Sequence, residues 1–178
     1  ALTNAQCNMT TFHYAYDTYS LHKVVTAAAV KQGYDTWFFL TVENAFGLQL
    51  EKRASNFVAA AGGHVLGTAA ITISETDFSR YIEAANRSSA KVIAVAAADR
   101  FAFPIIQALL KSGLPEGKRV AALLMSPDDV ERLGFAALPK VLLTVGFDPA
   151  RSEQSRAWSR RFVERTGLVP STIDAGVY

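Results

Sequence analysis

The sequence has 178 residues, of which 50% are hydrophobic and 19% are charged, and it carries a formal net charge of +2. This length allows one domain with a full hydrophobic core, and the scattered basic residues do not indicate a nucleic-acid-binding surface. The single cysteine, Cys7, excludes an intrachain disulfide and a zinc site built from several cysteines, and no apolar run is long enough to span a membrane.

The chain begins with a polar segment, residues 1–14, which predicts a loop, and Asp17 or Thr18 can cap the helix that follows. The run Trp37–Val42 is apolar or β-branched throughout, which is typical of a strand covered on both faces. A turn over residues 43–46 then leads into a helix whose apolar residues recur at helical spacing. This strand, turn and helix form the unit around which the rest of the chain is predicted to fold.

The same alternation continues to the end of the sequence. The predicted strands are, in chain order, Trp37–Val42, Val65–Ile73, Val92–Ala97, Arg119–Leu124 and Val141–Val145. The later helices are expected to begin at Thr76-Asp77, Phe101, Ser126-Pro127, Asp148-Pro149 and Ser171. The pattern predicts an α/β fold: a three-layer lobe with helices on both faces of a parallel sheet of about five strands, in flavodoxin-like order.

Ligands of open α/β sheets bind outside the carboxyl ends of the strands, which here points to loops 42–47 and 97–101. Asp99 and Arg100 could cap the next helix, pair with each other, or contact a polar ligand group. Phe46 and Phe101 could belong to the core, but a phenyl ring at a strand's end has less core to fill, which favours a place in the cleft. The aromatic residues of segment 12–19 could pack on the sheet or form a wall over the strand ends.

Patterns for catalysis, phosphate binding and metal binding are not found. Gly62-Gly63 precede a strand, whereas a dinucleotide fingerprint follows one, and there is no P-loop, H-E-x-x-H, G-x-S-x-G or paired-carboxylate motif. His13, His22 and His64 are scattered. The arginines of segment 156–165 alternate with glutamates, as on a solvated helix face. We therefore expect a protein that is not an enzyme and has no cofactor and no metal ion.

Several short motifs occur together in a particular order. They are Phe12-His-Tyr-Ala-Tyr-Asp17, Trp37-Phe-Phe-Leu-Thr41, Ala45-Phe-Gly47, Ala60-Ala-Gly-Gly63, Thr76-Asp-Phe-Ser79, Ala90-Lys-Val-Ile-Ala-Val95 and Gly146-Phe-Asp-Pro149. Their order and spacing resemble the solute-binding proteins of branched-chain amino-acid-type ABC importers, which have the type I periplasmic binding fold. The resemblance covers nearly the whole chain.

The resemblance implies two lobes that close on a ligand and deliver it to ABC permease subunits. Residues 1–148 resemble the second lobe, and residues 149–178 resemble a helical segment that returns to a missing first lobe. The unanchored start and the apolar end at Tyr178 likewise predict a fragment. The helices over 150–166 and 171–178 are then expected to pack non-natively or on a neighbouring chain. The implied location is periplasmic, or extracellular and lipid-anchored in a Gram-positive host.

By position, the resemblance also implies which residues contact ligand. Phe46 matches the aromatic residue that stacks on ligand, and residues 98–101 (Ala98, Asp99, Arg100 and Phe101) match a second cleft loop. Met125 and Ser126 fall near the acidic residue that pairs with a ligand ammonium in amino-acid binders. This place is not acidic here, and a buried ammonium without a carboxylate would be costly.

The site expected from the sequence therefore accepts an aromatic or other carboxylate, with an amino acid as the other possibility. Tyr16, Phe46 and Phe101 are the candidates for ring contacts, and Asp17, Asp99, Arg100 and Ser126 are the polar candidates. The alternative function is the ligand-sensing domain of a transcriptional regulator or receptor with the same fold.

Overall fold

The computed structural model describes residues 7–13, 16–97, 99–134 and 136–178. The chain forms two compact units. The larger unit is Thr18–Thr144, and the smaller unit combines Ala1–Asp17 with Val145–Tyr178.

The larger unit is built on a parallel sheet. Its strands within the described residues are β1 (Thr36–Val42), β2 (His64–Ile71), β3 (Val92–Ala96), β4 (Arg119–Ala122) and β5 (Val141–Leu142). They lie in the order β2-β1-β3-β4-β5, and every neighbouring pair is parallel. The structure thus confirms the α/β class and the flavodoxin-like strand order.

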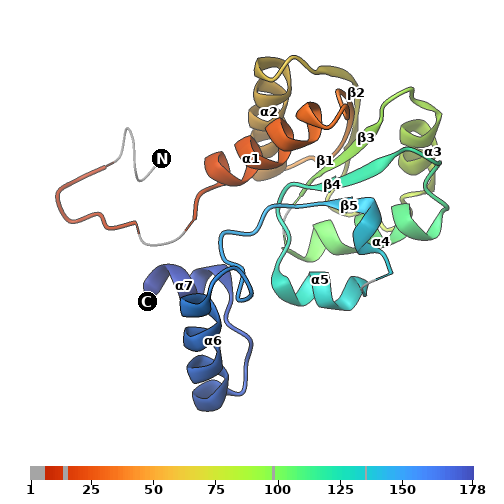
Figure 1. The fold of residues 1–178 in the computed structure, drawn as a ribbon. Helices are drawn as coiled ribbons and strands as arrows, with labels where there is room; N and C mark the ends of the chain where they lie inside the picture. Colours follow the sequence, from red (N-terminus) through yellow and green to blue (C-terminus); the bar gives the residue numbers. More distant parts are fainter. Residues whose placement is uncertain (1–6, 14–15, 98, 135) are drawn as a thin grey trace. The chain divides into compact units, whose positions relative to one another are not determined.

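Helices cover both faces of this sheet (Figure 1). They are α1 (Thr18–Lys31), α2 (Ala45–Ala60), α3 (Ser79–Arg87), α4 (Ala102–Lys111) and α5 (Pro127–Leu133), with short 3₁₀ turns η1 (Asp99–Phe101) and η2 (Leu138–Lys140). Helices α1 and α2 pack on one face, and α3 and α4 pack on the other. This is the predicted three-layer arrangement.

The core is divided between the two faces by the alternation of side chains along each strand. On β1, Trp37 and Phe39 belong to the cluster beneath α1 and α2, whereas Leu40 and Val42 belong to the cluster beneath α3 and α4. All residues of β3 are buried, which fits its place next to β1 in the interior of the sheet. The continuous apolar runs in the sequence reflect burial on both faces.

Helix α2 begins unusually close to the sheet. The Asn44 side chain caps it by accepting a hydrogen bond of 2.7 Å from the Gly47 backbone N–H. A Cβ placed on Gly47 would lie 2.2 Å from the Val42 carbonyl oxygen and 2.9 Å from the Ala96 carbonyl oxygen. The first turn of α2 is therefore held against the carboxyl ends of β1 and β3. Because the helix starts at Ala45, Phe46 lies in its first turn and not in the predicted loop.

Other predicted boundaries are wrong where local contacts compete. The edge strand β5 stops at Leu142, because it pairs only with β4 and only over two residues. Asp148 does not start a helix, since its carboxylate accepts a 2.8 Å hydrogen bond from Ala150 N–H and closes a turn. Helix α3 has Phe78 at its cap position, without a side-chain cap.

The smaller unit contains helices α6 (Glu153–Thr166) and α7 (Thr172–Val177). Ser152 caps α6, and Ser171 with Asp174 forms a capping box at the predicted start of α7. Within this unit the Trp158 ring lies 5.1 Å from the Phe147 ring, 5.5 Å from the Phe162 ring and 5.1 Å from the Tyr178 ring. The two helices thus share an aromatic cluster centred on Trp158.

His22 is one of several buried polar side chains that have no hydrogen-bond partner among the described residues. His22 on α1 is fully buried, and neither ring nitrogen has a hydrogen-bond partner of normal geometry among the described residues. Burial lowers the pKa of His22 to about 4, Arg53 contributes in the same direction, and the backbone of Leu123 opposes the shift. The native protein therefore holds this imidazole in its neutral form near neutral pH.

The contact at Gly47 predicts that Gly47→Ala destabilises the protein by about 2 kcal/mol or more, because the methyl group would meet backbone atoms that cannot move aside. Urea unfolding measures the loss. Gln49→Ala, at an exposed position of the same helix, is the matched control and should change stability by less than about 0.5 kcal/mol. Equal effects of the two substitutions would contradict the close approach.

His22 predicts a pH dependence of stability. Its pKa of about 4 in the native state lies below the ordinary value of 6.5, so the unfolded chain takes up a proton first as the pH falls. The free energy of unfolding should have its full contribution from His22 above pH 6.5. It should fall by about 3 kcal/mol between pH 6.5 and 4, at about 1.4 kcal/mol per pH unit. Urea unfolding at several pH values measures this slope. His22→Gln should remove it, whereas His64→Gln, at an exposed position, should keep it.

Candidate functional site

A cavity of about 270 Å³ opens at the carboxyl ends of β1 and β2 in the larger unit. Its walls come from these strand ends, the loop 72–78, η1 and the start of α4. The lining residues are Val42, Ile71, Thr72, Ile73, Glu75, Thr76, Phe78, Arg100, Phe101, Pro104 and Ile105. This is the edge of a parallel sheet at which ligands bind, beside the point where the strand order reverses between β1 and β3.

The walls of this cavity are mostly apolar. Phe78 and Phe101 pack against the core cluster beneath α3 and α4, so their rings extend the core outward to the cavity. Phe101 was a predicted ring contact. Phe78 was assigned only to a helix, and Ile73 only to the end of a strand. The structure ends β2 at Ile71, which leaves Ile73 half-exposed in a loop beside the cavity.

Glu75 is one of two charged side chains that line the cavity, but its oxygens are already in use. Oε1 accepts hydrogen bonds from the backbone N–H of Asp77 (3.2 Å) and Thr76 (3.1 Å). Oε2 accepts from Arg80 (3.0 Å) and from the Tyr81 hydroxyl (3.3 Å). The Asp77 N–H, followed by these other donors, lowers the pKa of Glu75. A carboxylate has about four acceptor positions, so Glu75 is saturated and holds the loop 72–78 in shape.

Arg100 is the other charged side chain of the cavity. Its guanidinium carbon lies 4.9 Å from the centre of the Phe101 ring, within the range of a cation–π contact. The side chain is exposed, and it forms no ion pair or hydrogen bond with any side chain that the structure describes. The alternative that Arg100 pairs with Asp99 concerns a side chain outside the described set, and Ala98 also lies outside the described residues. Arg100 is therefore the charged side chain of this cavity that has no ionic partner among the described side chains.

The remaining predicted site residues lie elsewhere. Phe46, 40% exposed on α2, does not line this cavity. Met125 is half-buried and packs against the core cluster beneath α3 and α4. The Ser126 hydroxyl caps α5, because it accepts from Asp129 N–H and donates to an Asp129 carboxylate oxygen at 2.9 Å. Tyr16 and Asp17 belong to the smaller unit. Of the predicted set, the structure brings together Arg100 and Phe101.

A family model described as "periplasmic binding protein" matches residues 1–178, the whole chain. The chain belongs to this family. A crystal structure of a periplasmic binding protein from Burkholderia mallei is 39% identical, with a TM-score of 0.85. The match covers 98% of this chain and 47% of that chain. The fold is therefore that of the type I periplasmic binding proteins, as the sequence motifs indicated.

Two more distant structures share the fold. A branched-chain amino acid ABC transporter periplasmic ligand-binding protein from Burkholderia xenovorans is 24% identical, with a TM-score of 0.86, and the match covers 97% of this chain and 46% of that one. An ABC transporter solute-binding protein from R. palustris, in complex with benzoate, is 16% identical, with a TM-score of 0.76, and the match covers 98% and 48%. None of the curated proteins matches the chain. The chain thus spans about half the length of the solved relatives that it matches.

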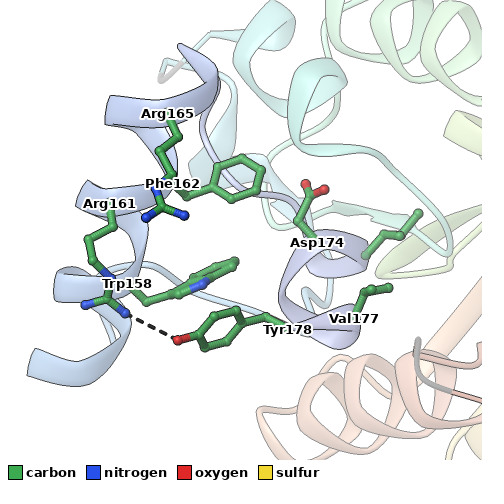
Figure 2. Close-up of a pocket in the computed structure, with 8 residues that line it drawn as sticks. Trp158, Arg161, Phe162, Arg165, Asp174, Val177 and Tyr178 are labelled. Atoms are coloured by element: carbon green, nitrogen blue, oxygen red, sulfur yellow. Dashed lines mark hydrogen bonds between the residues drawn. The ribbon is translucent and has the colours of Figure 1, made fainter.

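This periplasmic binding protein has a second cavity, in its smaller unit, of about 570 Å³ (Figure 2). Trp158, Phe162 and Tyr178 line it, together with Arg161 and Arg165, and Arg161 donates a 3.4 Å hydrogen bond to the Tyr178 hydroxyl. The prediction of a solvated arginine face describes Arg156 and Arg160, which form ion pairs with Glu153. Arg161 and Arg165, which line the cavity, are also exposed on this helix, so the prediction holds for them as well.

The part of the chain that the structure describes contains neither a candidate metal site nor a candidate membrane-spanning helix. Its histidine, cysteine and carboxylate side chains form no group of three or more that could hold a metal ion. Among the described helices, none has the length and apolar character of a membrane span.

The hydrogen bonds of Glu75 predict that Glu75→Gln loosens the loop 72–78, because an amide nitrogen cannot accept from Arg80 or Tyr81. The melting temperature should fall, and by several times more than for Glu83→Gln. Glu83 is the matched control because it also pairs with an arginine, Arg87, but both side chains of that pair are more than half exposed. Equal shifts in differential scanning calorimetry would show that Glu75 has no special part in the loop.

Proposed function

We propose that this protein captures a small organic carboxylate, most favourably an aromatic one, and releases it unchanged to an ABC transporter. The observation that carries the proposal is Arg100, which lines an apolar cavity without an acidic partner among the described side chains. A guanidinium presents two parallel N–H donors that match a carboxylate. Binding of this kind requires no nucleophile, general base or cofactor.

The charge balance of the cavity supports an anionic ligand. Glu75 is a carboxylate, but its acceptor positions are filled by two backbone N–H groups, Arg80 and Tyr81. Arg80 and Glu75 also form an ion pair of 3.0 Å, so their charges largely offset each other. Arg100 is left as the charge available to a ligand, and a negatively charged group complements it.

An α-amino acid is a poorer match. Its ammonium group requires a carboxylate partner when it leaves water. Met125 and Ser126, where the family resemblance locates an acidic residue in amino-acid binders, carry no charge. Asp129, one turn further, already accepts from Ser126 and pairs with Arg132 at 3.0 Å. Glu75 is saturated and Asp129 is neutralised by Arg132, so neither offers an unpaired carboxylate to an ammonium.

The walls and size of the cavity support an aromatic ring. Phe78, Phe101 and Pro104 provide flat apolar surfaces, and about 270 Å³ is near the lower end of the range for small-molecule sites. A single ring with one carboxylate fits these limits. The R. palustris structure shows that the same fold can hold benzoate.

The ligand is proposed to bind between two lobes. The chain spans 47% of the Burkholderia mallei relative, so residues 1–148 would form the second lobe and residues 149–178 would return to the first. The first lobe would supply the opposite wall, and Tyr16, Asp17, Phe46 and residues 98–99 would add contacts upon closure. The 178 residues alone should then bind weakly. Permease subunits are the proposed partners, and the periplasm, or the outer surface of a Gram-positive cell, is the proposed location.

A thermal-shift screen of the intact protein with benzoate, hydroxybenzoates, leucine and valine tests the ligand class. The benzoates should raise the melting temperature. Arg100→Gln should weaken benzoate binding by about tenfold or more, because a charged hydrogen bond contributes about 1.5–3 kcal/mol. Arg87→Gln, an exposed arginine outside this cavity, is the control and should leave affinity unchanged. Stabilisation by leucine and valine alone would refute the proposed ligand class.

A further inference from the structure

Two threonines line the same cavity as Arg100. Thr72 directly follows β2, and Thr76 lies further along the loop 72–78. Both residues are exposed, and neither side chain has a hydrogen-bond partner among the residues that the structure describes. The other polar side chains among the described lining residues are the saturated carboxylate of Glu75 and the guanidinium of Arg100. The two hydroxyls are therefore the uncharged polar groups that these residues offer to a ligand.

Glu75 holds the backbone at both threonines. Its N–H donates to the Thr72 carbonyl at 3.1 Å, and its Oε1 accepts from the Thr76 N–H at 3.1 Å. Arg80 and Tyr81 hold the same carboxylate in turn. The two hydroxyls thus project from one hydrogen-bonded wall, and a wall that is formed in advance loses less conformational entropy when a ligand binds.

This wall and Arg100 lie on opposite sides of β1. The strand order is β2-β1-β3, so the loop after β2 and the turn after β3 leave the sheet with the end of β1 between them. Neighbouring strands are about 4.8 Å apart, which separates the starts of these two connections by about 10 Å. Val42, the last residue of β1, lines the cavity between them. A gap of this order accommodates one aromatic ring with a polar group at each end.

We propose that the solute is an aromatic acid with a hydroxyl group on the ring carbon opposite the carboxylate, and that Thr72 and Thr76 recognise this hydroxyl. The inference rests on the proposed function, because Arg100 has to hold the carboxylate. With the carboxylate at Arg100, a hydroxyl on the opposite ring carbon points to the loop 72–78. A hydroxyl on the ring carbon next to the carboxylate stays at the Arg100 end.

An uncharged hydroxyl suits this wall better than a charged group does. A phenolic hydroxyl donates and accepts hydrogen bonds, as a threonine hydroxyl does, and it is uncharged near neutral pH. A second carboxylate would find no free cation on this wall, because Arg80 already pairs with Glu75 at 3.0 Å. An ammonium would find no free carboxylate for the same reason. A methyl group in this place would cover the two threonine hydroxyls and leave them without water or a partner.

Calorimetric titration of the intact protein with benzoate, 4-methylbenzoate, 4-hydroxybenzoate and 2-hydroxybenzoate tests the proposal. 4-Hydroxybenzoate should bind about tenfold more tightly than 4-methylbenzoate, which has nearly the same shape but cannot form the hydrogen bonds. 2-Hydroxybenzoate should bind no more tightly than benzoate. Equal affinities for benzoate and its two 4-substituted derivatives would overturn this proposal and leave the carboxylate proposal standing. Failure of all four acids to bind would refute both.

Substitution of both threonines identifies the residues that are responsible. Thr72→Val combined with Thr76→Val replaces each hydroxyl by a methyl group, so 4-methylbenzoate should then bind at least as tightly as 4-hydroxybenzoate. Each single variant should show part of this change. Ser74→Ala removes an exposed hydroxyl of the same loop that does not line the cavity, and it should keep the preference. A preference that survives in the double variant would overturn the proposal, because the ligand hydroxyl would then be recognised elsewhere.

Discussion

Only a hydrogen atom fits in place of a side chain at Gly47, because the carbonyl oxygens of Val42 and Ala96 lie where a Cβ would be. This contact holds the first turn of α2 against the carboxyl ends of β1 and β3. The loops that leave these strands start from the same level of the sheet. The cavity that Arg100 lines takes Val42 from the end of β1 and Phe101 from the turn after β3, so its shape depends on where these central strands end.

The fold could be predicted from the sequence because strands that are buried on both faces have a recognisable run of apolar and β-branched residues. β3 and most of β1 are buried, and their residues are correspondingly apolar or β-branched. The ends of the elements were harder to predict. β5 stops early because it has a single neighbouring strand. Helix α6 starts later than predicted, because the Asp148 carboxylate accepts a hydrogen bond from the Ala150 N–H and closes a turn before the helix. Such competition between local hydrogen bonds does not show in hydrophobic periodicity.

The candidate site was predictable only in part. Arg100 and Phe101 follow β3 at the switch point, so strand order alone identifies their loop. Phe78 and Ile73 reach the same cavity because the Glu75 carboxylate holds the loop between them in shape. This carboxylate accepts hydrogen bonds from Thr76, Asp77, Arg80 and Tyr81. No local pattern reveals that network before the chain is folded. The sequence suggested Ser126 both as a helix cap and as a ligand contact, and in the structure its hydroxyl caps α5.

Glu75 and Arg100 contribute differently to the fold, and this difference affects how the sequence of such a protein can diverge. Glu75 is committed to the loop, whereas Arg100 projects from a short 3₁₀ turn and supports none of the described hydrogen bonds. Under the proposed function, replacing Arg100 would change the charge that the cavity offers to a solute and would remove only its contact with the Phe101 ring. A duplicated gene could therefore acquire a new solute preference through one codon, while the scaffold that folds around it stays the same.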